Sequence, residues 1–165
     1  MRVKEIICLL CAAIIVCSMS SCSISARVKR ADKKYNIGEY YAAADMYKQV
    51  YKQVKSKDKK TRAHVAFYQG ECYRILNNSK AANAYKNAIR NHYQDSIVYL
   101  HYAQVLQYQG KYKDAIKQYD IYLEGHPSDY VAQAGKYACL KVEEWKQQHS
   151  RYRVAPAKEF NAKRS

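Results

Sequence analysis

The side chains that most often perform catalysis are present in this chain but are scattered along it. Five histidines occur, at His64, His92, His101, His126 and His149. No two of them stand at metal-ligand spacing, and no cysteine accompanies them. No glycine-rich phosphate loop occurs, and the one carboxylate pair, Glu143 and Glu144, consists of neighbours that would point to different sides of a helix. The sequence therefore predicts a protein that is not an enzyme and uses no metal or cofactor.

The start of the chain indicates export from the cytosol. Arg2 and Lys4 precede twelve residues, 6–17, that carry no polar side chain, and a short serine-rich stretch follows. This order is typical of a secretory signal. The apolar run is too short for a permanent span, which needs about 20 residues. Residues 1–21 are therefore predicted to be a removed signal peptide.

The residue that this signal leads to is Cys22. The stretch at residues 19–22, Met-Ser-Ser-Cys, resembles the lipobox of bacterial lipoproteins, in which a lipid is attached to the cysteine and cleavage occurs just before it. The resemblance implies that Cys22 is the lipid attachment site. The alternative is an ordinary signal peptide with an incidental cysteine. A lipidated and N-acylated cysteine carries enough acyl chains for stable anchoring.

The chain that remains after residue 21 is strongly basic. Removing the two basic residues and one acidic residue of the signal leaves 27 Lys and Arg against 13 Asp and Glu, a formal charge of +14. In a cytosolic protein this balance would indicate nucleic acid, which the signal peptide argues against. Outside the cytosol, the same charge favours anionic lipid, acidic polymers such as peptidoglycan, or acidic protein surfaces.

A spaced pattern of small and aromatic residues recurs along the chain. Two full copies and a shorter one between them lie at Gly38, Tyr40, Ala43 and Tyr47, at Ala81, Tyr85 and Ala88, and at Gly110, Tyr112, Ala115 and Tyr119. The first alanines of the copies are 38 and then 34 residues apart. Repeats of this length indicate a stack of similar helical units. Alanines let two helices approach closely, while tyrosines fill the space beside them.

A period of 34 residues with these marks resembles the tetratricopeptide repeat (TPR), and the best match runs from Tyr99 to Pro127. The resemblance implies an all-α, TPR-like α-solenoid of about three helical hairpins plus a C-terminal capping helix. Helices are expected at residues 24–37, 39–56, 60–76, 79–91, 95–109, 111–124 and 128–148. Because Glu143, Glu144 and Lys146 are polar, the last helix is expected to face water as a cap.

The repeats also divide the chain and place its cysteines. The expected division is a lipoprotein signal peptide at 1–21, a TPR-like domain at 22–148, and a basic linker or tail at 149–165. Cys72 and Cys139 hold the same place in first helices two units apart, so they should be about 20 Å apart. Since a disulfide needs less than about 7 Å between Cα atoms, both are expected to be buried thiols.

The concave face of such a stack is lined by the first helix of each unit. On this register the candidate partner-binding groove contains Tyr35, His64, Phe67, Glu71, Arg74, Gln104 and Tyr108, beside Asp32, Ile97 and Leu100. Its mixed lining suits an extended peptide or a partner helix. Several of these residues could instead only pack neighbouring helices. The Lys and Asn positions with which some TPR proteins clamp a C-terminal carboxylate hold other residues here.

The order of lipobox, TPR-like helices and tail resembles the N-terminal part of outer-membrane lipoproteins in which such repeats precede a β-propeller and an OmpA-like domain. Some of these envelope proteins serve type IX secretion. The resemblance implies a lipid-anchored protein on the periplasmic face of the bacterial outer membrane. Surface-exported lipoproteins of such bacteria often carry an acidic cluster after the lipidated cysteine. No such cluster follows Cys22, so the resemblance implies the inner leaflet of the outer membrane.

Two functions of different classes follow from these features. The first is a non-enzymatic protein–protein interaction scaffold that binds other envelope proteins, as part of a secretion or envelope assembly. The alternative is direct binding of anionic envelope polymer or lipid by the basic surface, above all by residues 48–62, which hold seven Lys and Arg against one acid. Binding by exposed charge should be lost at about 1 M salt, where the screening length is about 3 Å, whereas an apolar contact should persist.

The lipobox generates the first testable prediction. The N-terminal peptide of the mature protein should begin at Cys22 and carry lipid, because the signal run ends directly before this residue. Mass spectrometry of that peptide from the native host checks it. An unmodified peptide that begins at another residue would contradict the prediction.

Overall fold

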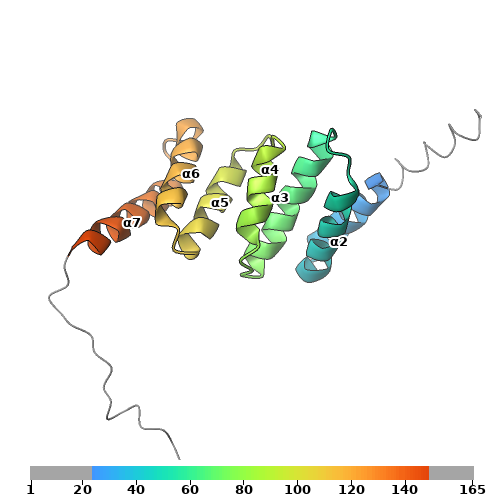
Figure 1. Cartoon of the computed structure of the whole chain (residues 1–165), viewed down its shortest axis with the longest axis horizontal. Coiled ribbons are helices and arrows are strands. Elements are labelled where there is room, and N and C mark those ends of the chain that lie inside the picture. Colours follow the sequence, from blue (N-terminus) through green and yellow to red (C-terminus); the bar gives the residue numbers. More distant parts are fainter. Residues whose placement is uncertain (1–23, 149–165) are drawn as a thin grey trace, which may run out of the picture.

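Residues 24–148, which the computed structural model describes, form seven helices and no strand. A first helix over residues 24–36 is followed by six labelled helices: α2 (Tyr40–Gln53), α3 (Lys59–Ile75), α4 (Ala81–Arg90), α5 (Ile97–Tyr108), α6 (Tyr112–Gly125) and α7 (Tyr130–Gln147). Figure 1 shows them side by side in one row from the N-terminal to the C-terminal end. The expected helices are confirmed, with ends that differ by at most three residues. The signal peptide, Cys22 and the tail lie outside the described residues.

The helices begin and end where the local sequence provides a turn. Gly38 and Gly110 adopt the left-handed backbone, with φ of 81° and 72°, directly before α2 and α6. Asn77, with φ of 50°, takes the same role before α4. Asp58 and Asp129 accept hydrogen bonds from the backbone N–H groups of Thr61 and Ala132, so they cap α3 and α7.

The repeated tyrosines are the largest side chains in the interior. Tyr47 and Tyr85 are fully buried and Tyr119 is 2% exposed. Their phenols donate to Asp32 Oδ1 at 2.6 Å, Glu71 Oε1 at 2.5 Å and Gln107 Oε1 at 2.7 Å. The acceptor always comes from the first helix of the same hairpin. Burial of each ring therefore fixes the pairing of its two helices by both packing and a hydrogen bond.

Two glycines allow these rings to lie close to a neighbouring backbone. A Cβ added at Gly70 on α3 would lie 2.8 Å from Cε1 of Tyr85. A Cβ added at Gly135 on α7 would overlap the phenol of Tyr119. Tyr85 thus sits against its partner helix within a hairpin, whereas Tyr119 sits against the first helix of the next unit. Both contacts need a residue without a side chain.

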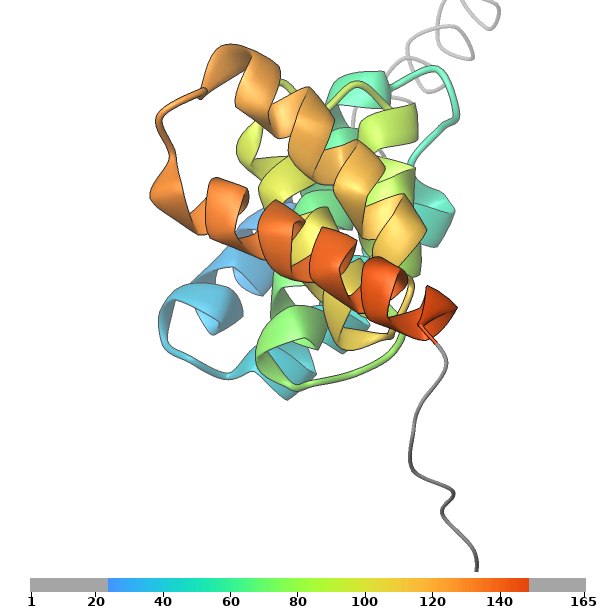
Figure 2. The ribbon, with the colours of Figure 1, turned by 90° about the vertical axis from the view of Figure 1, so that its left-hand side faces the viewer.

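The C-terminal helix is present and its polar residues Glu144 and Lys146 are exposed as predicted, but the same helix also exposes large apolar side chains. Five large apolar side chains on α7 are exposed, namely Tyr130, Val131, Tyr137, Leu140 and Trp145. Only Ala132 and Cys139 of this helix are buried. Figure 2 shows α7 across the end of the row, with its outer side turned away from the other helices. In the preceding hairpins this side of a first helix is covered by the helix that follows, and no described helix follows α7.

Cys72 and Cys139 are buried free thiols, as the repeat register predicts. None of the helices in residues 24–148 is both long and apolar enough to cross a bilayer.

The contact between Gly135 and Tyr119 generates a stability prediction. Gly135→Ala should lower the free energy of unfolding by about 1–3 kcal/mol, because the added methyl group overlaps a ring that is almost fully buried. Urea unfolding followed by circular dichroism measures the change. Gly125→Ala is the matched control, since a Cβ there meets no atom within 4 Å. Equal stabilities of the two variants would show that α7 does not pack as described.

Candidate partner-binding face

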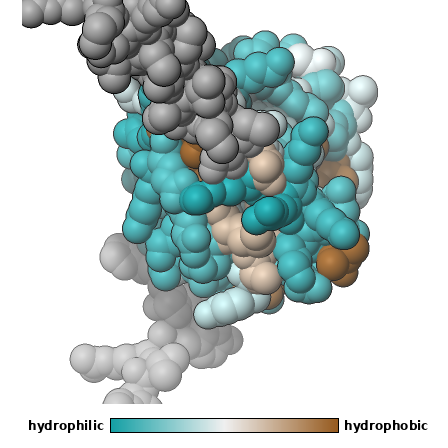
Figure 3. Space-filling view, turned by 90° about the vertical axis from the view of Figure 1, so that its right-hand side faces the viewer, coloured by the Kyte–Doolittle hydropathy of each residue, from teal (hydrophilic) through white to brown (hydrophobic). Residues whose placement is uncertain are grey.

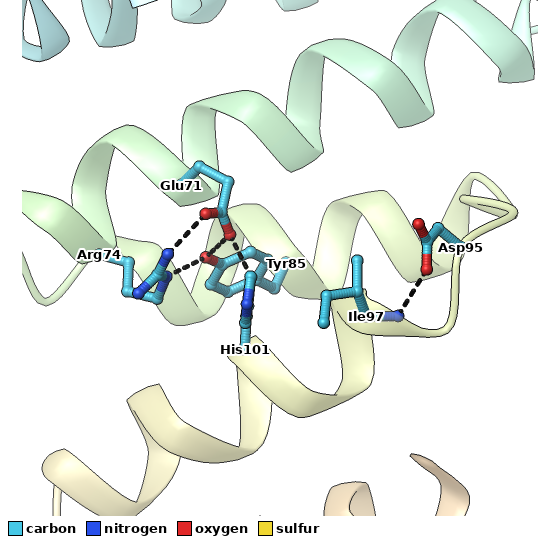
Figure 4. Close-up of polar contacts among 6 residues, drawn as sticks. All are labelled: Glu71, Arg74, Tyr85, Asp95, Ile97 and His101. Atoms are coloured by element: carbon cyan, nitrogen blue, oxygen red, sulfur yellow. Dashed lines mark hydrogen bonds and ion pairs between the residues drawn. The ribbon is translucent and has the colours of Figure 1, made fainter. Parts of the chain in front are cut away.

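The most buried charged side chain among the described residues is Glu71 on α3, at 4% exposed. Its carboxylate accepts hydrogen bonds from Tyr85 at 2.5 Å and from Arg74 Nη2 at 2.7 Å, and it lies 2.6 Å from His101 Nδ1. Arg74 also donates to the Tyr85 hydroxyl at 3.2 Å. Figure 4 shows the four side chains converging from α3, α4 and α5. One carboxylate thus joins a hairpin to the first helix of the next.

The bonding partners of Glu71 decide its charge. Burial alone would raise the pKa of this carboxyl, but hydrogen bonds from His101, Arg74 and Tyr85 outweigh burial and lower the pKa to about 2. The carboxylate in turn raises the pKa of the Arg74 guanidinium, against the effect of burial. Both groups are therefore charged at neutral pH. Arg74 is held and neutralised rather than available as a free cation.

A similar arrangement occurs one unit earlier. Asp32 on the first helix accepts from Tyr47 of α2 at 2.6 Å, and the same oxygen lies 3.0 Å from His64 Nε2 of α3. Acid, tyrosine and histidine again come from three successive helices. This network is more open than that of Glu71, since the side chains of His64 and Asp32 are 38% and 33% exposed.

The junction between α6 and α7 lacks such a network. Tyr119 bonds to the neutral amide of Gln107, and the position on α7 that faces its hydroxyl is Gly135. Carboxylates that accept from a tyrosine and meet a histidine bridge the first two junctions of the solenoid. At the third, Tyr119 packs on Gly135, and the polar contacts include the Lys136–Asp120 ion pair at 2.6 Å and a hydrogen bond from the Tyr122 hydroxyl to Asp129 at 3.0 Å.

Phe67, one of the residues expected to line the groove, is not on the open surface. Its side chain is 6% exposed and stacks on Tyr93 with centroids 4.1 Å apart. It also meets Tyr68 edge to face, and Tyr68 meets Tyr35 in the same way. The register places Phe67 on the first helix correctly, but the loop after α4 covers it. Phe67 is therefore a core residue that partners cannot reach.

The other expected groove residues are divided among separate hollows. Arg74, Gln104 and Tyr108 line one hollow of about 290 Å³ between the α3–α4 turn and α5. His64 lines two other hollows near the start of α3, and Tyr35 packs against Tyr40 and Tyr68.

The α3–α4 turn supplies much of the lining of the hollow beside Tyr108. The residues that complete it are Tyr73, Asn77, Asn78, Ser79, Ala81, Val105 and Gln109. Gln109 donates to the Ser79 carbonyl at 3.0 Å, and Asn78 accepts from the Lys80 N–H at 3.0 Å, so these contacts hold the turn against α5. Tyr108 stands at the rim and is 78% exposed. The hollow thus offers amides and hydroxyls around a small apolar floor.

The described residues contain neither a cluster of metal ligands nor an activated cysteine. No group of three His, Cys, Asp or Glu side chains there could hold a metal ion. Burial raises the pKa of the Cys72 thiol to about 12, and the charge of Glu71 adds to the shift, so this thiol is not a nucleophile at neutral pH. Burial likewise raises the pKa of Cys139.

Several solved structures share this arrangement of helices. The TPR domain of P58(IPK) superposes with a TM-score of 0.63 at 14% identity, over 79% of this chain and 36% of that one. The C-terminal TPR-containing domain of a Plasmodium falciparum FK506-binding protein gives 0.68 at 12% identity, over 78% and 94% of the two chains. MamA gives 0.57 at 17%, over 81% and 79%. The fold is an all-α, TPR-like solenoid.

The sequence comparisons add no closer relationship. No protein-family model matches the chain, and no curated protein matches it. The chain spans about a third of the P58(IPK) chain that it resembles. Each repeat unit begins with one of four helices: the helix over residues 24–36, α3, α5 or α7. The hollow beside Tyr108 lies between α3 and α5, the first helices of the second and third units.

The Glu71 network generates a pH prediction. Because the folded pKa of about 2 lies below the ordinary value of 4.5, the charge of Glu71 stabilises the fold above pH 4.5, and this contribution is lost as the pH falls towards 2. The shift corresponds to roughly 3 kcal/mol. Glu71→Gln should therefore lower the free energy of unfolding at pH 7 and flatten its decline between pH 4.5 and 2.

Urea unfolding at a series of pH values measures both effects. Glu144→Gln is the control, because Glu144 is exposed and pairs only with Lys141 within residues 24–148. A Glu71→Gln variant with unchanged pH dependence would contradict the assigned network.

Proposed function

We propose that this chain is a non-enzymatic protein-binding scaffold, anchored by lipid on Cys22 at the periplasmic face of the bacterial outer membrane. Its partners are other envelope proteins of a secretion or envelope assembly. The lipobox-like residues 19–22 support the anchor, and the TPR solenoid supports the binding role. The resemblance of the whole chain to the front of type IX-associated envelope lipoproteins supports the assembly.

The observation that carries the binding role is the hollow beside Tyr108. Asn77 and Gln104 side chains can pair with the N–H and C=O groups of an extended peptide. Ala81 and Val105 form an apolar floor on which a side chain of that peptide can rest, and the exposed ring of Tyr108 can cover it. Because Glu71 neutralises Arg74, the hollow favours an uncharged peptide segment.

The exposed apolar face of α7 gives independent support. Five of the eleven exposed large apolar residues in the described part of the chain lie on this one helix. Exposed apolar surface gathered in one place marks protein or membrane interaction sites and ligand-binding grooves.

The hollow generates a binding prediction. A photo-crosslinking residue placed at Tyr108 should capture an envelope protein of defined mass in the native host, because this ring stands exposed at the rim. Once that partner is identified, Tyr108→Ala should weaken its affinity by about tenfold or more, since aromatic anchors carry about 1–2 kcal/mol or more of an interface.

Tyr41 on α2 is the matched control for both measurements. It is 82% exposed and lies outside every hollow described above. Equal capture from Tyr41 and Tyr108, or an unchanged affinity of Tyr108→Ala, would remove the hollow as the binding site.

A further inference from the structure

The N-terminal end of the solenoid brings together two basic segments that are far apart in the sequence. The start of the first helix lies beside the α2–α3 connection, and the two enclose a hollow of about 690 Å³. Arg27 Nη1 on the first helix donates to Gln53 Oε1 at the end of α2 at 2.7 Å. Ile24, Val28 and Val54 supply the apolar part of the hollow.

The α2–α3 connection is held in one conformation. Arg62 of α3 donates to the backbone carbonyls of Tyr51 at 3.3 Å and Val54 at 2.9 Å, and its guanidinium lies 4.1 Å from the centre of the Tyr51 ring. Asp58 caps α3 by accepting from the Thr61 N–H at 3.1 Å. Val54 is buried between these contacts. The lysines around this connection therefore project from a fixed backbone.

Four of those lysines, Lys55, Lys57, Lys59 and Lys60, form what we call the lysine cluster. All four are exposed, as is Lys29 on the facing first helix. Within residues 24–148, no carboxylate pairs with any of the five.

The two acids that line the same hollow are engaged elsewhere. Asp32 accepts from Tyr47 and contacts His64, and Asp58 caps α3. The outward-facing charge at this end of the molecule is therefore positive. Figure 3 looks onto this end, and outside the grey atoms its surface is mostly hydrophilic around a narrow apolar strip.

We propose that the lysine cluster and Lys29 form a docking surface for the headgroups of an anionic phospholipid bilayer. The proposal rests on the lipid anchor at Cys22 proposed above. Cys22 stands two residues before Ile24, so an extended chain places the anchor within about 7 Å of this hollow. The membrane surface must then lie at the N-terminal end of the solenoid.

The chemistry of the hollow fits a phospholipid headgroup. Lysines at the rim can contact phosphate oxygens, and the apolar residues below them can contact the glycerol and the first carbons of the acyl chains. Each lysine near an anionic surface strengthens partitioning by about fivefold at physiological salt. Docking by four or five lysines would orient the row of helices away from the bilayer, with α7 at its far end (Figure 1).

The test is a lysine footprint of the protein purified from the native host and placed in lipid nanodiscs. One set of discs contains phosphatidylglycerol and phosphatidylethanolamine, and the other contains phosphatidylcholine alone. Acetylation of each lysine is followed by mass spectrometry. The lysine cluster and Lys29 should be modified at least about fivefold more slowly in the anionic discs. The exposed lysines Lys80, Lys86, Lys111 and Lys117 should react equally in both sets.

Two charge-reversal variants sharpen the result. Changing the four residues of the lysine cluster to Glu should abolish the protection of Lys29 in the anionic discs. Changing Lys80, Lys86, Lys111 and Lys117 to Glu alters the net charge equally and should leave that protection intact. About 1 M salt should remove the protection in every anionic sample.

The anchor and the docking surface can fail separately. Equal acetylation in the two sets of discs overturns the docking surface, whatever Cys22 carries. If the protein from the native host carries no lipid on Cys22 and its lysine cluster is still protected, the surface is supported and the anchor is overturned. Protection of Lys29 that survives reversal of the cluster also overturns the proposed surface.

Discussion

A buried tyrosine hydroxyl in every hairpin is the constraint on which this solenoid depends. Removing a phenol from water costs free energy unless the hydroxyl finds a partner inside the protein. Asp32, Glu71 and Gln107 meet this need from the paired helix. The first two are carboxylates, and each also contacts a histidine on the next unit, at 3.0 Å for Asp32 and His64 and at 2.6 Å for Glu71 and His101. The carboxylate that accepts the tyrosine hydrogen bond within a hairpin therefore also links that hairpin to the next one.

The sequence predicts the repeat architecture well, because periodicity reports directly on which residues face the partner helix. Ala43, Ala115 and their tyrosines mark the hairpins, and Gly110 marks a turn. The networks are harder to predict, since Glu71 meets His101 only after two helices have stacked. The prediction that Phe67 lines an open groove is wrong for a related reason. The loop that contains Tyr93 covers its ring, and this loop carries no repeat pattern from which the contact could be predicted.

The two ends of the solenoid show what periodicity leaves out. Polar residues at the end of α7 predict a cap. Tyr137 and Leu140 of the same helix are also exposed, and they occupy the side that a following helix covers in earlier units. At the other end, residues 24–29 and 53–60 are too distant in sequence for a pattern to relate them. They become one surface only because the first helix lies back along α2.

The difference between the junctions also makes the molecule mechanically uneven. Carboxylate bridges with short hydrogen bonds resist sliding, because each bond breaks over a small displacement. The Tyr119 ring makes no such bond to α7. The polar contacts of this junction are a hydrogen bond from Tyr122 to Asp129 and half-exposed ion pairs such as Lys136–Asp120, which stabilise less than a buried carboxylate bridge. Under tension, α7 would therefore peel away while the α3–α5 region stays assembled. The solenoid would unfold first at its C-terminal end, while the hairpins joined by Glu71 would stay packed.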